Sequence, residues 1–389
     1  MRLILTLATM LVALPAYAQT ASDILEILNT TDVAPVELMK PSAVAVDADG
    51  NVYVAATLSN NAFQITPSGT VNVIIDSLGD GGGNPLLSPT DIAVDAAGNV
   101  YVAGLVSNNV FKIPPGGPPS QIIDGTGVPG NPAIVLNGPS AIDVDSSSNV
   151  YVAGSLTHNA FKITPSGTVT ELISTTGDGI HGLLVPLSIA VGPNGNVYVS
   201  GSTSNNVFEI TPDATITEII DIGPLIGPPG RLETPREVVV DADGNVYVTG
   251  QFSNNAFRIT PDGTIDEIID ETGGELANPL GAPLHIAVDL SGNVFLTGTD
   301  TDNAFTIDTP DGCSVAGTPC TITEIIDETG DGMAAVDAPL GIAVGDDGSV
   351  FITGSDSDNV FVPEPGAAML QLISVLVLVG LRRMRRSAC

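Results

Sequence analysis

The sequence predicts an all-β fold: a seven-bladed β-propeller of four-stranded antiparallel blades, in which an N-terminal strand closes the last blade. Three features of the 389-residue chain lead to this prediction. A unit of about 48 residues recurs along the chain, and each unit holds four short apolar runs. The one run missing from the end of the last unit is found near the N-terminus instead.

An Asn before an aromatic-bearing run marks each repeat. Its copies are Asn61, Asn109, Asn159, Asn206, Asn255, Asn303 and Asn359, spaced by 48, 50, 47, 49, 48 and 56 residues. In the first unit the apolar runs are residues 43–46, 52–55, 62–65 and 71–75. They are separated by Asp-Ala-Asp-Gly, Ser-Asn-Asn and Pro-Ser-Gly, which are typical turn sequences. Runs this short, rich in Val, Ile, Tyr and Phe, predict antiparallel strands.

The fourth runs show how the ring closes. Six of them lie at residues 71–76, 119–124, 169–174, 216–221, 265–270 and 322–327. None follows Phe361, but residues 24–29 (Ile-Leu-Glu-Ile-Leu-Asn) match residues 322–327 (Ile-Thr-Glu-Ile-Ile-Asp). This N-terminal strand is therefore expected to complete the last blade and to remove the exposed sheet edges. A solenoid or a pair of β-sandwiches is the alternative, and neither predicts a strand permuted to the front.

The two ends of the chain read as targeting segments that flank a propeller at residues 19–362. Residues 1–18 combine Arg2, an apolar run at 3–14 and the ending Ala-Tyr-Ala, which predicts a secretory signal cleaved before Gln19. An ordinary buried strand or helix is the alternative there. Residues 363–389 begin with Pro363-Glu364-Pro365, followed by sixteen uncharged residues at 366–381. A basic cluster comes next, formed by Arg382, Arg383, Arg385 and Arg386.

This order of motif, hydrophobic helix and basic cluster resembles the PEP-CTERM family of bacterial sorting tails. The resemblance implies processing by an exosortase-type enzyme and delivery to the outer surface or extracellular matrix of a Gram-negative bacterium. Sixteen helical residues reach about 24 Å, short of the hydrocarbon thickness, so the transmembrane helix fits a transient handle better than a permanent anchor. A plain single-pass anchor with cytoplasmic Arg residues is the alternative.

Charge limits the partners that the chain can have. Acidic residues outnumber basic ones by 44 to 11, which gives a formal net charge of −33. Such a chain repels nucleic acid and anionic membrane surfaces, and we exclude both as main partners. Apolar residues make up 43% of the chain and charged residues 14%, a balance that favours a large core over disorder.

The repeat unit resembles the NHL repeat. The resemblance covers residues 24–362 and is carried by residues 89–95 (Pro-Thr-Asp-Ile-Ala-Val-Asp), 98–102 (Gly-Asn-Val-Tyr-Val) and 107–109 (Ser-Asn-Asn), preceded by Gly-Asp-Gly at 79–81. It implies a scaffold for recognition, in a class that includes binding modules, lyases and lactonases. Ala or Val and then Phe follow the Asn pair, where NHL repeats have a basic or polar residue, so RNA- or protein-binding roles do not transfer directly.

One repeat position varies in chemistry and predicts a site. The residues that begin each first strand should look into the central channel, and there the units carry Ala43, Asp91, Ala141, Ser188, Glu237, His285 and Gly341. Asp91, Ser188, Glu237 and His285, with Arg236 beside them, are candidate ligand-binding residues at the channel mouth. Asp91, Glu237 and His285 could hold a metal, with Ca2+ suggested by the resemblance to calcium-dependent lactonase propellers. The alternative is a water-filled mouth that tolerates any polar residue.

Other repeated residues have structural interpretations. Nearly every aromatic lies at one position of the second strand or one of the third, which predicts packing between blades. The Asp-x-Asp-Gly-Asn turns lack the distal Glu of a calcium loop and are interpreted as turns. His158 and His181 are expected to be solvated. Cys313 and Cys320 bracket the insertion in the sixth unit and suit a disulfide that closes its third and fourth strands, with two free thiols as the alternative.

The sequence lacks a nucleophile elbow, a phosphate loop, a paired-Cys zinc motif and a dinucleotide fingerprint. We therefore expect an exported surface or matrix propeller that acts as a binding or structural module for polysaccharide or protein. A metal-dependent lactonase or lyase that works at the channel mouth is the alternative.

Overall fold

The computed structural model describes residues 25–29, 32, 37–127, 134–221, 230–272, 279–308, 313–315, 317–330, 332 and 334–363. The secretory signal, Glu364, Pro365, the expected C-terminal helix and the Arg cluster lie outside these residues. No helix within the described ranges is long and apolar enough to cross a membrane.

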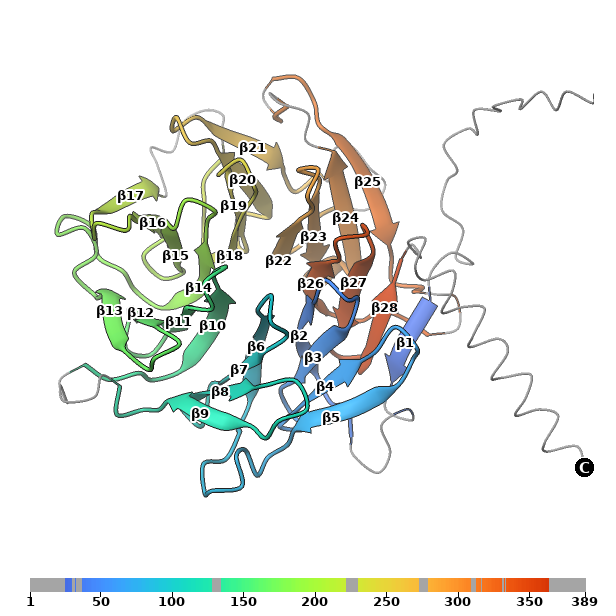
Figure 1. Ribbon diagram of the computed structural model, residues 1–389. Helices are drawn as coiled ribbons and strands as arrows, with labels where there is room; N and C mark the ends of the chain where they lie inside the picture. The colour runs from blue at the N-terminus through green and yellow to red at the C-terminus, as the bar shows by residue number, and fades with distance from the viewer. Residues whose placement is uncertain are drawn as a thin grey trace, which may run out of the picture.

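Seven four-stranded antiparallel sheets form a ring, with the first strand of every blade nearest the centre (Figure 1). Blade 1 contains β2 (Pro41–Val46), β3 (Val52–Ala56), β4 (Asn61–Ile65) and β5 (Val71–Ile75). Blade 2 contains β6 (Pro89–Val94), β7 (Val100–Gly104), β8 (Asn109–Ile113) and β9 (Ser120–Ile123). Blade 3 contains β10 (Pro139–Val144), β11 (Val150–Gly154), β12 (Asn159–Ile163) and β13 (Val169–Ile173). Blade 4 contains β14 (Pro186–Val191), β15 (Val197–Gly201), β16 (Asn206–Ile210) and β17 (Ile216–Ile220).

The remaining blades follow the same order. Blade 5 contains β18 (Pro235–Val240), β19 (Val246–Gly250), β20 (Asn255–Ile259) and β21 (Ile265–Ile269). Blade 6 contains β22 (Pro283–Val288), β23 (Val294–Gly298), the 3-10 turn η2 (Thr299–Thr301), β24 (Asn303–Asp308) and β25 (Thr321–Ile326). Blade 7 contains β26 (Pro339–Val344), β27 (Val350–Gly354) and β28 (Asn359–Val362), and β1 (Leu25–Asn29) completes it.

The N-terminal strand closes the ring, as the sequence predicts. β1 pairs antiparallel with β28, with Leu25 opposite Val362 and Asn29 opposite Asn359. Figure 1 shows the two strands side by side, at opposite ends of the colour scale. The buried Leu28 packs in one apolar cluster with residues of blades 1 and 7, including Phe63 and Val360. The last blade therefore joins the two ends of the propeller chain.

The repeated aromatics pack between blades. Tyr101 on β7 lies in the same apolar cluster as Val152 and Phe161 of the next blade, and Phe161 is fully buried. The Tyr101 hydroxyl donates to Asp95 Oδ2 at 2.9 Å, and the same turn carboxylate accepts the N–H groups of Ala97 and Asn99. Internal donors thus satisfy the turn Asp, as the turn interpretation predicts.

A ring of side chain to backbone hydrogen bonds joins each blade to the next. The last residue of each second-to-third turn accepts the N–H of the residue before the proline that opens the next first strand, at 2.6 to 2.9 Å. We call these contacts the blade clamps. The acceptors are Asn60, Asn108, His158, Asn205, Asn254, Asp302 and Asp358, and the donors are Ser88, Gly138, Val185, Thr234, Ala282, Ala338 and Lys40.

Two details of the clamps were not expected. His158 was predicted to be solvated, but its Nδ1 accepts the Val185 N–H at 2.9 Å, because it replaces the Asn of the other blades. All seven donors have φ between 46° and 61°, the left-handed region that non-glycine residues rarely adopt. The clamps hold this backbone in place, at a conformational cost that only Gly138 avoids.

His181 is the other histidine that was predicted to be solvated. Its side chain is 47% exposed, and its Nδ1 lies 3.0 Å from Glu218 Oε2.

The disulfide predicted in blade 6 is confirmed. Cys313 and Cys320 are bonded, with 4.9 Å between their Cα atoms, and they close the insertion between β24 and β25. The Val315 N–H donates to the Glu267 carbonyl at 2.7 Å, so the insertion also contacts the outer strand of blade 5.

Candidate functional site

A cavity of about 690 Å3 opens at one end of the central channel. It lies where the second-to-third turns meet the connections that lead into the first strands, and the first strands of all seven blades contribute to its wall. We call it the channel mouth. Its volume is in the range of small-molecule sites in proteins.

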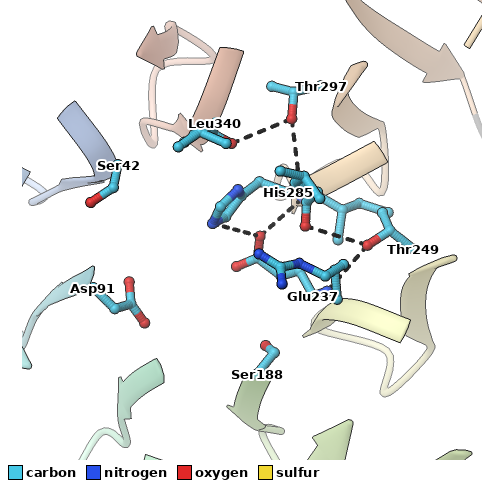
Figure 2. Close-up of polar contacts among 12 residues, drawn as sticks. Ser42, Asp91, Ser188, Glu237, Thr249, His285, Thr297 and Leu340 are labelled. Atoms are coloured by element: carbon cyan, nitrogen blue, oxygen red, sulfur yellow. Dashed lines mark hydrogen bonds and ion pairs between the residues drawn. The ribbon is translucent and has the colours of Figure 1, made fainter. Parts of the chain in front are cut away.

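All five residues predicted for this site line the channel mouth. They are Asp91, Ser188, Arg236, Glu237 and His285. Figure 2 shows Asp91 on the far side of the open centre from Glu237 and His285, with Ser188 below them. Neighbouring strand residues normally point to opposite faces, but the β18 pairing shifts register between Pro235 and Val238. This bulge brings both Arg236 and Glu237 onto the wall.

Three of these side chains fasten one blade to the next. Asp91 Oδ2 accepts the Ile142 N–H at 2.8 Å, and Glu237 Oε2 accepts the Ile286 N–H at 3.1 Å. Ser188 Oγ accepts the Val238 N–H of β18 at 3.1 Å. The polar residues at the mouth therefore have a structural role in addition to any role in binding.

Glu237 and His285 lie within ion-pair distance of each other at the mouth. Glu237 Oε2 lies 3.8 Å from His285 Nε2, and about a quarter of each side chain is exposed, at 27% and 26%. The other ring nitrogen, Nδ1, is buried and makes no hydrogen bond of ordinary geometry, although the Leu340 carbonyl lies close enough to raise the imidazole pKa slightly.

Burial shifts the pKa values of His285, Asp91 and Glu237 at the mouth. It lowers the pKa of His285 to about 3, helped by the charge of Arg236, so the imidazole is neutral at ordinary pH. Burial raises the pKa of Asp91 to about 7, against the hydrogen bonds from the Ile142 and Ile92 N–H groups. Burial, with the charge of Asp91, also raises the pKa of Glu237 well above its usual value. The mouth therefore carries less negative charge than its sequence suggests.

The predicted metal ligands share the cavity without forming a ligand group. Among the residues that the structure describes, no three His, Cys, Asp or Glu side chains are grouped so that they could hold a metal ion. Asp91 stands across the channel from the Glu237 and His285 pair (Figure 2). A neutral imidazole and two carboxyl groups with raised pKa values are also a poor donor set for Ca2+, which prefers charged oxygens. Ca2+ binding stays a prediction from the sequence, and we derive no chemistry through it.

A second cavity, of about 730 Å3, lies between blades 1 and 2 at the opposite end of the strands. Its wall includes Asp47 and Asp95, whose oxygens accept hydrogen bonds from their own turns and from Tyr53 and Tyr101. These carboxylates are engaged within the fold, so we regard the channel mouth as the better candidate site.

Comparisons with known proteins agree with this architecture. A family model described as a β-propeller repeat (SBBP) matches residues 72–112. Among curated proteins no sequence match is found. Virginiamycin B lyase from Staphylococcus aureus has a similar fold, with a TM-score of 0.65, 17% identity and coverage of 87% of this chain and 98% of the lyase. Hydrazine synthase from Kuenenia stuttgartiensis gives a TM-score of 0.64 at 16% identity, covering 84% of this chain and 95% of that one.

A further structure of the S. aureus lyase, inactivated by a His→Ala substitution, contains quinupristin. It has 16% identity to this chain and a TM-score of 0.64, and the match covers 87% of this chain and 98% of the lyase. At such identities the likeness shows the fold alone, because propellers with very different activities share it.

Apart from the predicted Arg236, the structure adds wall residues that sequence reasoning missed. One position before the variable one, the first strands carry Ser42, Thr90, Ser140, Leu187, Arg236, Leu284 and Leu340, and all of these line the mouth. Blades 1 to 3 thus present small hydroxyls, whereas blades 4 to 7 present three leucines and one arginine. Lys40, in the connection before β2, lines the mouth as well. The sequence contains the signal for these residues, because this repeat position changes from Ser or Thr in blades 1 to 3 to Leu or Arg in blades 4 to 7. It lies directly before the variable position from which the site was predicted.

Proposed function

We propose that this chain is an exported bacterial propeller that binds a ligand at the channel mouth, in the cell envelope or extracellular matrix. The observation that carries the proposal is the cavity of about 690 Å3, whose wall breaks the repeat. The rest of each blade keeps nearly the same residues, as scaffolds do, while the mouth combines arginine, histidine, carboxyl and leucine side chains. Such a mixture of apolar surface and few polar groups is typical of binding sites.

Export and sorting belong to the same proposal. The signal-like residues 1–18 and the tail that resembles PEP-CTERM support it, and the Cys313–Cys320 disulfide suits an oxidising compartment. Polysaccharide or another surface protein is the partner class expected from that location, with an exosortase-type enzyme acting on the tail.

The experiment is a glycan array combined with a pull-down from the host envelope, using the full-length chain. We expect a retained ligand that Arg236→Gln fails to hold and that Arg231→Gln holds normally, because Arg231 is exposed and lies outside the cavity wall. Equal capture by both variants would place the binding surface somewhere other than the mouth.

A lyase or lactonase is the second candidate, favoured by the Glu237 and His285 pair and by the fold shared with a lyase. His285 would be the residue able to accept a proton. A base with a pKa of about 3 is weak at neutral pH, however, and general bases work best near the operating pH. Binding is therefore our conclusion. Turnover of a lactone or depsipeptide that is lost in His285→Ala would reverse this ranking, and a single calorimetric Ca2+ site lost in Glu237→Ala would restore the metal-dependent version.

A further inference from the structure

Two basic side chains of the propeller differ from the others. Residues 19–362 contain Lys40, Lys112, Lys162, Arg231, Arg236 and Arg258. Four of these have partners, which are Tyr101 for Lys112, Tyr151 for Lys162, Glu233 for Arg231 and Asp266 for Arg258. The side chains of Lys40 and Arg236 make no hydrogen bond or ion pair with any residue that the structure describes, and both line the channel mouth.

Unpaired cations are unusual in so acidic a chain. With 44 acidic residues available, a free lysine and a free arginine in one cavity indicate that a negative group from elsewhere completes the site. Arg236 precedes Glu237 on β18, and the two form no ion pair, although the charge of Glu237 acts to raise the pKa of Arg236. Arg236 keeps its charge even though burial lowers its pKa. Its planar guanidinium suits a carboxylate, which it can bind through two parallel hydrogen bonds.

The repeat position of Arg236 holds leucine in the neighbouring blades. Leu187 of blade 4 and Leu284 of blade 6 occupy the same repeat position on either side of it, and Leu340 of blade 7 follows. On the other half of the mouth, the hydroxyls of Ser42, Thr90 and Ser140 donate to carbonyls of the next blade. In blades 4 to 6 the equivalent bonds come from the second strand, through Ser200, Thr249 and Thr297. Because the second strand supplies these hydrogen bonds, the first-strand position does not need a hydroxyl and can hold leucine or arginine.

No described residue on the wall of the mouth is Phe, Tyr or Trp. Aromatic rings are the usual surface for stacking the apolar face of a flat ligand, and sites for neutral ligands of that kind rely on them. Branched aliphatic side chains instead favour a flexible aliphatic chain, whose burial is driven by apolar area alone.

We propose that the channel mouth binds a small amphipathic carboxylate, with its carboxylate on the Arg236 guanidinium and its aliphatic part along Leu187, Leu284 and Leu340. The inference rests on the proposed function, since it requires the mouth to be the binding site. It names an organic acid with an aliphatic chain, in place of polysaccharide or protein, as the preferred ligand class at the mouth.

Isothermal titration calorimetry with three probes tests the inference on the full-length chain. Decanoate carries both the charge and the chain, acetate the charge alone, and octyl β-glucoside a chain with a neutral sugar. We expect one decanoate site, at least tenfold tighter than either other probe. Arg236→Gln should weaken decanoate binding by about tenfold or more, the usual effect of losing a hydrogen bond to a charged group. Arg236→Lys should recover part of the loss.

Matched variants guard against effects on folding. Arg231→Gln removes the same charge outside the cavity wall and should leave decanoate affinity unchanged. Leu187→Ser introduces the residue that Ser42 and Ser140 supply at this position, and it should weaken decanoate by about fivefold without affecting acetate. Each variant is accepted only if its melting temperature matches the parent.

The outcomes separate the inference from the proposed function. Equal decanoate affinity in the parent and Arg236→Gln overturns the inference. Tighter binding of octyl β-glucoside than of decanoate also overturns the inference. If Leu187→Ser weakens the binding of octyl β-glucoside, the mouth remains the binding site. If no probe binds and the captured partner is indifferent to all mouth variants, the proposed function fails as well.

Discussion

Asp91 links single-residue chemistry to the stability of the ring. Its carboxyl group has a pKa of about 7 in the folded protein, against 3.8 in an exposed setting, because burial disfavours its charged form. The charged or titratable groups around it are Asp143 on β10 and, across the cavity, Glu237 and Arg236. Folding therefore holds a proton on Asp91 that the unfolded chain releases.

Asp91→Asn should become more stable relative to the parent as pH rises. A folded-state pKa above the unfolded value means that stability is fully present below about pH 4 and declines up to about pH 7. An amide pays no such penalty, so the melting temperature of the variant minus that of the parent should increase from pH 4 to pH 8. Asp49→Asn, at an exposed turn on the opposite face, controls for the change in net charge. A difference that does not vary with pH would contradict the account.

At the residue scale, the sequence predicted which residues line the channel mouth better than it predicted the contacts that they make. The start of each first strand was expected to face the channel, and all five predicted residues do line the mouth. What could not be read was the binding of Asp91, Ser188 and Glu237 to N–H groups of the following blade, because those donors lie about 50 residues away in the chain. Lys40 was missed because it belongs to a connection and not to a strand pattern.

The blade clamps are the element-scale feature with the largest expected energetic effect. Asn205→Gly removes the acceptor of the Thr234 N–H while tolerating the left-handed backbone, with φ of 56° at this position. Leaving that donor without a partner should cost about 1–3 kcal/mol of unfolding free energy, measured by urea denaturation. Asn72→Ala, on the exposed side of β5, should change the same quantity by less than about 0.5 kcal/mol. Similar losses in both variants would show that the clamps do not matter.

The disulfide of blade 6 makes a second element-scale prediction. Cys313 and Cys320 are seven positions apart, so the loop they close is short and its entropic contribution should be at the lower end, about 2 kcal/mol. The double variant Cys313→Ser, Cys320→Ser should lose that much unfolding free energy and should therefore unfold at a lower denaturant concentration. Reduction of the parent should reproduce the loss and leave the variant unchanged. A variant as stable as the oxidised parent would argue against a stabilising crosslink.

Strand positions were predictable because each depends on a local pattern repeated seven times. The third and fourth strands fell within a residue or two of their expected bounds, and turn residues such as Gly50 and Asn60 do adopt positive φ. Blade-to-blade contacts were harder, since nothing in the sequence alone shows that the last turn residue reaches the backbone of the next blade.

On the scale of the whole molecule, the ring depends on β1. Leu28 is fully buried against residues of blades 1 and 7, so Leu28→Ala should cost about 2–5 kcal/mol in unfolding free energy. Leu25→Ala, at a half-buried position on the same strand, should cost clearly less. Calorimetric melting of both variants measures this. Comparable losses of stability in the two variants would mean that β1 closes the ring but adds little to its stability.

The two faces of the ring differ in how closely they keep the repeat. One face of the ring repeats its Asp turns from blade to blade, whereas the other carries exposed Val106, Leu156 and Phe252 on the turns of blades 2, 3 and 5, and Asp300 and Asp356 at the equivalent positions of blades 6 and 7. Val106 and Leu156 also line the mouth. Apolar turn residues therefore lie beside the hydroxyl-bearing blades 2 and 3, and the acidic turn residues lie on blades 6 and 7, beside Leu284 and Leu340.

Hydrogen–deuterium exchange across the full-length chain, with and without decanoate, tests the central claim most directly. Binding at the channel mouth should slow exchange in the segments that open the first strands of blades 4 to 7, such as residues 234–238 and 283–286, and should leave the Asp turns of the opposite face unchanged. Protection confined to those turns or to the outer strands, or the same pattern in Arg236→Gln as in the parent, would contradict the account.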